Sequence, residues 1–271
     1  MLSWVDGQPA ESLAVTDRGL AYGDGLFETI AVTAGVPSLL DRHLARLSQG
    51  CARLAIPCDE PRIHAELLAF CQALGEGVAK LILTRGDGLR GYAPPQPAQS
   101  RRILQGGAKP NYPAVNAEQG IRLFPCATRL AEQPVLAGLK HLNRLEQVLA
   151  RGEWQDAEHA EGLMRDISGR VVEGVYSNLF LIKDGRLSTA DLSRCGVAGV
   201  MRAELLERAA ALGLVCDIRD ISLDELVAAD EVFLCNSLYG IWPVRALQAH
   251  GWPVGPLTRK LQAITRDLLD C

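Results

Sequence analysis

Hydrophobic and polar residues alternate along this chain with two different periods, and each period predicts a different kind of element. In residues 39–54 the apolar side chains return every three or four positions, which predicts an amphipathic helix with one buried face. Residues 26–32 form a short apolar run between glycine-rich turns, which is typical of a strand. The same patterns predict a hairpin in residues 1–15, further helices at 61–74, 201–212, 223–227 and 257–269, and strands at 79–84, 102–104, 121–124, 161–164, 171–173, 178–182, 232–235 and 240–246.

One stretch shows neither period. Residues 109–118 contain Pro110 and Pro113 without helical or strand spacing, which favours an interdomain linker. We therefore expect a smaller N-terminal α/β domain at 1–108 and a larger C-terminal domain at 119–271, in which mixed strands are accompanied by helices. The predicted fold class is α/β, of the α+β kind, and 271 residues are enough for two modest domains with cores.

The composition is that of an ordinary globular protein, and it argues against several classes of function. Hydrophobic residues make up 48% of the chain and charged residues 22%. The formal net charge of −4 gives no general attraction to nucleic acid or to an anionic membrane. No apolar run approaches the ~20 residues of a membrane span, and the first residues do not resemble a signal peptide. We expect a cytoplasmic protein that binds neither nucleic acid nor membrane.

The cysteines and histidines suggest neither disulfides nor a metal site. None of the eight cysteines belongs to a C-x-x-C pair, and several lie in apolar runs such as 232–235. We therefore expect reduced, mostly buried thiols. The five histidines show no metal-ligand spacing, and H-E-x-x-H is absent, so no metal is predicted.

The candidate chemistry begins at a lysine within residues 137–149. Lys140 has apolar neighbours and precedes a stripe of Leu142, Leu145, Val148 and Leu149, which predicts an amphipathic helix. If the lysine is desolvated its pKa falls, because burial disfavours the charged ammonium form. A neutral amine can attack a carbonyl group and form a Schiff base. The alternative is a solvated lysine at the start of a helix, and spacing alone favours that alternative.

A Schiff-base lysine suits a pyridoxal phosphate enzyme when three further features accompany it: an acid beside the pyridine nitrogen, a phosphate cradle and a clamp for the substrate carboxylate. Glu173, at the end of a predicted strand, could be the acid or a surface residue. The glycine-flanked turn at 196–202 opens a helix, whose free N–H groups favour phosphate, although plain loop-to-helix junctions are commoner. Arg46 could add a bidentate clamp and Ser237 a hydroxyl, or Arg46 could be solvated.

Taken in order, these segments resemble a known family. The run GLKHLNRLEQVL at 138–149 closely resembles the Schiff-base lysine segment of the fold-type IV pyridoxal phosphate enzymes, and among them of the 4-amino-4-deoxychorismate lyases. The resemblance covers nearly the whole chain, and several weak signals in the family's order are more specific than any one of them. The other matching segments are DRGLAYGDGLFE at 17–28, LARL at 44–47, EGVYSNLF at 173–180, the turn at 196–202 and the segment 235–244.

The resemblance implies the two-domain fold of fold-type IV, pyridoxal 5'-phosphate as the cofactor of the C-terminal domain, and a homodimer that completes the site. It implies that Lys140 forms the Schiff base and carries the proton, and that Glu173 pairs with the pyridine nitrogen. Arg90 and Tyr92 match positions that bind the substrate carboxylate in related aminotransferases. The other cofactor-binding residues that the resemblance implies are Arg46, Asn178, Ser237, Val200 and Met201.

The implied reaction converts 4-amino-4-deoxychorismate to 4-aminobenzoate and pyruvate, a lyase step of folate biosynthesis. Met201 stands where the related aminotransferases usually carry threonine, and the missing hydroxyl favours the lyase branch. The alternative within the fold is an aminotransferase that acts on branched-chain or D-amino acids. A third hypothesis is a non-catalytic cofactor carrier, and the complete set of lysine, glutamate and arginine argues against it.

Overall fold

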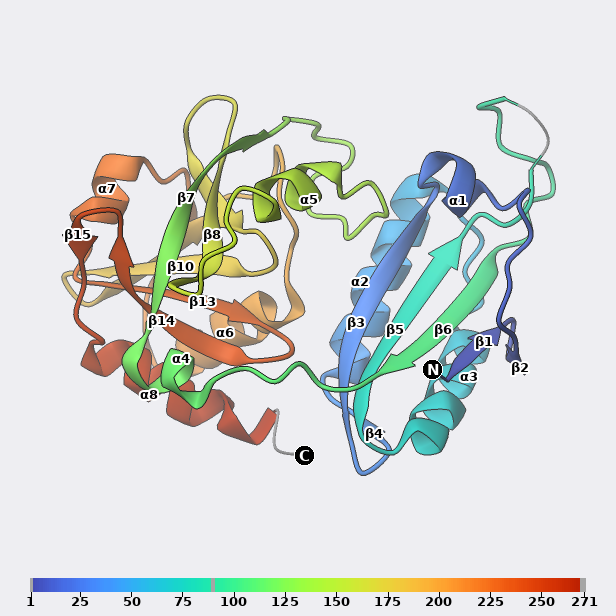
Figure 1. Ribbon diagram of the computed structural model, residues 1–271, viewed down its shortest axis with the longest axis horizontal. Coiled ribbons are helices and arrows are strands. Elements are labelled where there is room, and N and C mark those ends of the chain that lie inside the picture. Colours follow the sequence, from blue (N-terminus) through green and yellow to red (C-terminus); the bar gives the residue numbers. More distant parts are fainter. Residues whose placement is uncertain (1, 89–90, 269–271) are drawn as a thin grey trace. The chain divides into compact units, whose positions relative to one another are not determined.

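The computed structural model describes residues 2–88 and 91–268, and their contacts divide them into two compact units (Figure 1). The first unit comprises the described residues of Met1–Pro110, Leu139–Asn143 and Leu268–Cys271. The second comprises Asn111–Gly138 and Arg144–Asp267. Each unit has its own sheet and its own apolar core. The segment Leu139–Asn143 thus belongs to the first unit, although it lies within the range predicted for the C-terminal domain.

The first unit is an antiparallel sheet with helices packed on it. The strand order is β2-β1-β6-β5-β3-β4, and every neighbouring pair is antiparallel. The predicted hairpin, helices and strands are present, whereas the short α1 and β4 were not predicted. The elements are β1 (Ser3–Val5), β2 (Gln8–Pro9), α1 (Arg18–Tyr22), β3 (Gly25–Thr33), β4 (Val36–Pro37), α2 (Leu40–Leu54), α3 (Glu60–Leu74), β5 (Gly77–Thr84) and β6 (Arg101–Gly107).

The alternation of side chains along β3 decides what this unit buries. Leu26 and Ile30 lie in one core with Leu47 of α2 and Phe70 of α3, and none of these four side chains is more than 3% exposed. Successive residues of a strand point to opposite faces, so Glu28 faces the same side as Leu26 and Ile30. A carboxylate is therefore buried beneath the helices, where it requires partners of its own.

The second unit is a mixed sheet whose strands close on themselves. The pairing runs β12-β11-β10-β13-β14-β7-β8-β9, and β9 also pairs with β10 through Glu173 and Asn178. The pairs β11–β12, β14–β7 and β7–β8 are parallel, and the others are antiparallel. The elements are α4 (Ala114–Gln119), β7 (Ile121–Leu130), α5 (Leu145–Arg151), β8 (His159–Asp166), β9 (Val171–Gly174), β10 (Asn178–Lys183), β11 (Arg186–Ala190), α6 (Val200–Ala211), β12 (Cys216–Arg219), α7 (Leu223–Val227), β13 (Glu231–Asn236), β14 (Gly240–Leu247), β15 (His250–Gly251), α8 (Pro256–Thr265) and η1 (Arg266–Leu268).

Several segments of the second unit differ from the sequence prediction. The expected linker 109–118 contains the start of α4, a six-residue helix that is too short to show a helical period and that packs against β14. The strands β11, β12 and β15 were not predicted. The last helix ends at Thr265 and continues as a 3₁₀ turn to Leu268, and residue 269 of the predicted helix lies outside the described residues.

The helix predicted after Lys140 is present, but it starts after the first residue of its apolar stripe. The helix α5 begins only at Leu145, because residues 140 and 142 form backbone hydrogen bonds with β3 instead. Leu145, Val148 and Leu149 are 75%, 64% and 63% exposed, so the predicted apolar stripe faces outward in this chain.

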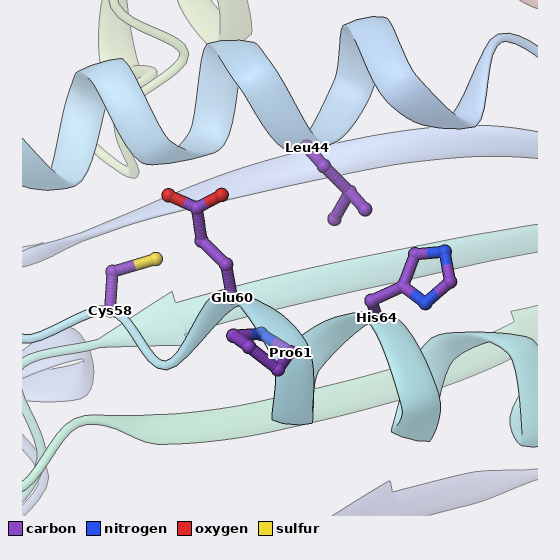
Figure 2. Close-up of a pocket in the computed structure, with 5 residues that line it drawn as sticks. All are labelled: Leu44, Cys58, Glu60, Pro61 and His64. Carbon is purple, nitrogen blue, oxygen red and sulfur yellow. The ribbon is translucent and has the colours of Figure 1, made fainter.

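Several classes of site can be checked in the part of the chain that the structure describes. There, no helix is long and apolar enough to cross a membrane, no cluster of three potential ligands could hold a metal ion, and the cysteines are free thiols. The first unit has a pocket of about 510 Å³ beside α2 and α3, and none of the predicted site residues lines it (Figure 2). Its lining residues are Leu44, Cys58, Glu60, Pro61 and His64.

Candidate functional site

Lys140 is held against strand β3 by the backbone on both of its sides. The N–H of Phe27 donates to the carbonyl of Lys140 at 2.9 Å, and the N–H of Leu142 donates to the carbonyl of Gly25 at 3.0 Å. Gly25 has to be glycine, because a Cβ there would lie 2.5 Å from the carbonyl oxygen of Leu83 and 2.9 Å from Leu142 Cδ1. The lysine backbone is thus fixed by the glycine-rich motif at 17–28.

The side chain of Lys140 is half-buried and faces an aromatic ring. Its Nζ lies 4.4 Å from the centroid of Phe27, and Nζ of Lys80 lies 5.2 Å from the same centroid. A cation over a ring face is attracted by the ring quadrupole, by about 0.5–1 kcal/mol at exposed sites. The Phe27 ring therefore packs against the end of the Lys140 side chain.

Arg46 is bound by the buried carboxylate of Glu28. Nε of Arg46 donates to Oε1 at 2.8 Å, and Nη2 donates to Oε2. Nδ1 of His43 lies 2.6 Å from Oε2, which places its proton on Nδ1. Burial alone would raise the pKa of Glu28, but Arg46 and His43 lower it to about 2. Burial in turn lowers the pKa of His43.

Sequence reasoning found Arg46 but missed Glu28 and His43. The signals were present, since Glu28 interrupts an apolar strand and His43 precedes Arg46 by three residues on one helix face. A carboxylate that is predicted to be buried needs a cationic partner. Arg46, one helical turn from His43, offers such a partner on the helix that packs against the strand.

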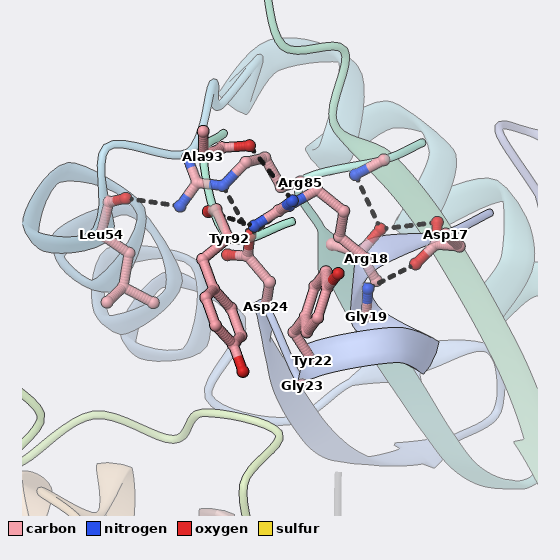
Figure 3. Close-up of polar contacts among 12 residues, drawn as sticks. Asp17, Arg18, Gly19, Tyr22, Gly23, Asp24, Leu54, Arg85, Tyr92 and Ala93 are labelled. Atoms are coloured by element: carbon pink, nitrogen blue, oxygen red, sulfur yellow. Dashed lines mark hydrogen bonds and ion pairs between the residues drawn. The ribbon is translucent and has the colours of Figure 1, made fainter. Parts of the chain in front are cut away.

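A second polar network in the first unit secures the loop at 91–93. Nε of Arg18 and Nε of Arg85 both donate to Oδ2 of Asp24 at 2.8 Å (Figure 3). The other guanidinium nitrogens of Arg18 donate to the carbonyls of Gly91 at 3.1 Å and Tyr92 at 2.9 Å. The Tyr92 side chain is 85% exposed and packs beside Tyr22, while Arg90 lies outside the described residues. The roles predicted for Arg90 and Tyr92 stay predictions.

In the second unit, Glu173 and Asn178 lie on paired strands and share one set of hydrogen bonds. Asn178 Nδ2 lies 3.5 Å from Glu173 Oε2 and donates to the carbonyl of Val197 at 2.8 Å. The N–H of Val197 donates to Glu173 Oε2 at 2.8 Å. Glu173 is 3% exposed and Asn178 5%. Glu173 is therefore a fixed, buried carboxylate, and the alternative of a strand-end surface residue is wrong.

The same asparagine fixes the start of helix α6. The N–H of Gly199, the residue that precedes the helix, donates to Asn178 Oδ1 at 3.1 Å. A Cβ on Gly199 would lie 2.0 Å from that oxygen, so only glycine fits. No side chain caps this helix, so the N–H groups of Val200 and Met201 at its start are not used by a capping side chain. The resulting turn is a cradle of backbone donors of the kind that binds phosphate.

The sheet register brings the turn with Ser237 to the same end of the sheet. Asn178 is paired with Glu173 on one side and with Cys235 on the other. Ser237 follows two residues after Cys235 in a turn that Asn236 holds by accepting from the N–H groups of residues 238 and 239. The second unit thus gathers Glu173, Asn178, the Val200–Met201 turn and the Ser237 turn, and the first unit gathers Lys140 and Arg46.

The chain is similar to known proteins over most of its length. The sequence model of the amino-transferase class IV family matches residues 25–247. The chain belongs to that family. Class IV aminotransferases depend on pyridoxal phosphate, and the fold-type IV architecture and the cofactor predicted from the sequence are confirmed.

Three similar proteins divide into two activities. The chain is 70% identical to a 4-amino-4-deoxychorismate lyase from Pseudomonas aeruginosa, whose crystal structure it matches over 100% of both chains with a TM-score of 0.98. It is 36% identical to an aminodeoxychorismate lyase of Vibrio harveyi, over 96% of this chain and 97% of that protein. It is also 30% identical to a putative branched-chain-amino-acid aminotransferase of Methanocaldococcus jannaschii, over 98% and 93%.

The residues of this class IV chain fit the cofactor. The buried carboxylate of Glu173 suits a protonated ring nitrogen, and the uncapped start of α6 at Val200 and Met201 suits a phosphate. Lys140 offers a primary amine, and Arg46 a guanidinium whose orientation Glu28 fixes.

Proposed function

We propose that this protein is a 4-amino-4-deoxychorismate lyase that forms 4-aminobenzoate and pyruvate with pyridoxal phosphate. The observation that carries the proposal is the 70% identity to the Pseudomonas aeruginosa lyase over the full length of both chains. The Vibrio harveyi relative supports the same activity. Met201 in the phosphate turn is consistent with it, since that position relies on a backbone N–H rather than on a hydroxyl.

The proposed cofactor contacts use the two sets of residues described above. Lys140 would hold the cofactor covalently, and Glu173 would pair with its ring nitrogen. Arg46, the N–H groups of Val200 and Met201, and Ser237 would bind its phosphate, while Asn178 would hold Glu173 and the turn in place. When bound, the cofactor supplies an electron-withdrawing ring that accepts the electron pair left by removal of a proton from the substrate.

The protein residues then perform the proton chemistry. The Lys140 amine would remove the proton from the substrate ring carbon that carries the amino group. The fixed negative charge of Glu173 would keep the ring nitrogen protonated, because an ion pair favours the charged form of both partners. Loss of the enolpyruvyl oxygen leaves an aromatic ring, so the elimination is strongly downhill. Arg90 and Tyr92 are the proposed residues for the substrate carboxylate.

We further propose a homodimer that acts in the cytoplasm in folate biosynthesis. The exposed face of α5 supports the dimer, because Leu145, Val148 and Leu149 are all more than 60% exposed on one short helix. A contiguous exposed apolar surface commonly marks a protein interface. The domain ranges 1–108 and 119–271 also stay proposals, with Leu139–Asn143 folded onto the first unit.

One experiment separates the lyase from a class IV aminotransferase. Purified protein is mixed with 4-amino-4-deoxychorismate in the absence of any keto acid, and 4-aminobenzoate and pyruvate are measured together. The proposal predicts equal amounts of both over many turnovers. An aminotransferase requires a keto acid to turn over, so product only after addition of 2-oxoglutarate or pyruvate would contradict the proposal. The branched-chain aminotransferase relative makes this the necessary comparison.

A further inference from the structure

The second unit contains a buried carboxylate to which the proposed chemistry assigns no role. Glu161 of β8 has no exposed surface. Its Oε1 accepts from the N–H groups of Gly162 at 2.9 Å and Val175 at 3.0 Å. Its Oε2 accepts from the Ser177 hydroxyl at 2.8 Å and from the N–H of Tyr176 at 3.4 Å. All four donors are neutral, so this carboxylate is bound as a hydrogen-bond acceptor rather than as an ion-pair partner.

Three of these donors belong to the turn that joins β9 to β10. The turn is closed by a hydrogen bond from the N–H of Gly174 to the carbonyl of Ser177 at 2.8 Å. It rests directly on the carboxylate, because a Cβ on Gly174 would lie 2.2 Å from Ser177 Oγ and 3.0 Å from Glu161 Cδ. The conformation of this turn therefore depends on its contacts with the Glu161 side chain.

The turn connects the two residues on which the cofactor end of this unit depends. Glu173 immediately precedes Gly174, and Asn178 immediately follows Ser177. Among the described residues, the register of β9 and β10 pairs Glu173 with Asn178 alone, so the ladder between these strands does little more to fix their spacing. Any change in the turn is passed on to both residues without an intervening residue to absorb it.

We propose that Glu161 is a positioning residue that sets the placement of Glu173 and Asn178 through the turn at 174–177. The proposal rests on the cofactor role proposed for Glu173 and deepens it. Burial raises the pKa of Glu161 to about 7, and the hydrogen bonds from the turn and from Gly162 oppose that rise. We attribute the placement of Glu173 and Asn178 to the length of the Glu161 side chain, because this length brings its acceptor oxygens within hydrogen-bond distance of the turn.

Two variants separate position from charge. Glu161→Gln keeps the length of the side chain and one acceptor oxygen, and its amide can donate to Ser177. Glu161→Asp keeps the charge but is one methylene shorter, so its oxygens cannot reach the turn without moving it. The proposal predicts that the Gln variant retains most of the wild-type kcat. The Asp variant should lose up to about 10²-fold in kcat, which is the scale of a displacement of about 1 Å at a reacting group.

The matched control is a second buried carboxylate in the same unit. Glu231 is 6% exposed and accepts from the N–H groups of Leu257 at 3.2 Å and Thr258 at 2.8 Å, at the start of α8. Glu231→Asp should lower the melting temperature but leave kcat, cofactor affinity and the absorption of the bound cofactor unchanged. This control shows how the protein responds when a buried glutamate is shortened to aspartate at a position that affects only stability.

The measurements are made on the holoenzyme and include two that need no turnover. These are the dissociation constant of pyridoxal phosphate and the visible absorption of the bound cofactor across pH. The proposal predicts weaker cofactor binding and a shifted absorption profile for Glu161→Asp, and a profile close to wild type for Glu161→Gln. In Glu161→Asp, KM for the substrate should change less than kcat. Equal behaviour of Glu161→Asp and Glu231→Asp, or an Asp variant better than the Gln variant, would overturn it. If wild-type protein binds the cofactor but forms no 4-aminobenzoate, the proposed function fails while these two readouts still decide the role of Glu161.

Discussion

Replacement of Glu28 by glutamine tests the buried network that holds Arg46. The glutamine has nearly the same shape, but it offers one acceptor oxygen to the three donor contacts from Arg46 and His43 and turns an N–H group toward the others. The arginine then loses its counterion in a place where Glu28 is 1% exposed. Breaking a buried pair by removing one partner is strongly destabilising, because the remaining charge is uncompensated.

The magnitude follows from the pKa of Glu28, which is lowered from 4.5 to about 2 in the folded protein. This difference corresponds to about 3 kcal/mol of folding free energy at neutral pH. A lowered pKa contributes stability that is complete well above pH 4.5 and is lost as the pH falls through 4.5 toward 2. The difference between wild type and Glu28→Gln should therefore be about 3 kcal/mol at pH 7 and roughly half of that or less at pH 3.

Native-state hydrogen exchange measures this change where it occurs. Amides of α2 and β3 in the first unit should lose about 3 kcal/mol of protection at pH 7 in Glu28→Gln, while β10 and β13 of the second unit keep theirs. Urea unfolding at pH 7 and pH 3 gives the pH dependence. Cofactor affinity should also fall, because Arg46 is a proposed phosphate ligand. Equal protection of α2 in both proteins, or a difference that grows toward pH 3, would refute this reasoning.

Four further predictions concern single side chains. Lys140→Ala should reduce turnover to background without unfolding the protein, and borohydride treatment of wild type followed by peptide mapping should place the cofactor on Lys140 rather than on another lysine. Glu173→Gln should bind the cofactor and remain coloured, but lose about two to four decades of kcat in steady-state assays, as expected for ~3–5 kcal/mol from a buried charge pair; a fully active variant would rule out its role. Arg18→Lys cannot reproduce the bonds to the 91–93 loop and should raise KM for 4-amino-4-deoxychorismate at unchanged cofactor content, so an unchanged KM would argue against a substrate role for that loop. Leu145→Glu should shift the protein from dimer to monomer in sedimentation, and an unaffected dimer would exclude α5 from the interface.

Local periodicity predicted most elements but not the partners that fix the site. Strands and helices follow from side-chain spacing within a few residues, which is why the elements at 26–32, 39–54 and 178–182 were found. The bond between Arg46 and Glu28 joins residues 18 apart, and the hold of Glu173 on Val197 joins residues 24 apart, so no local pattern contains either. The exposure of the apolar stripe on α5 could not be predicted for a related reason. An apolar stripe indicates that a helix face is covered, but it does not say whether the same chain or another one covers it.

The wider resemblance supplied what periodicity could not. Segments such as 17–28 and 138–149 have no obvious relation to each other in a linear pattern, yet the structure pairs Gly25 with Leu142 and Phe27 with Lys140 through backbone hydrogen bonds. Their order along the chain indicated the family, whereas the contacts between them depend on the folded backbone.

Because Leu139–Asn143 belongs to the first unit, that unit cannot finish folding during translation until this later segment has been made. The sheet of that unit is complete once residue 107 has been made, but the segment that covers Gly25 and Phe27 is still 32 to 36 residues away. At the ~5–20 residues per second of translation, this leaves an interval of roughly 2–7 s. During that time Leu26 and its neighbours lack the strand-like segment with which they later pair. A nascent-chain experiment should show protease-resistant folding of the first unit only after residue 143 has left the exit tunnel.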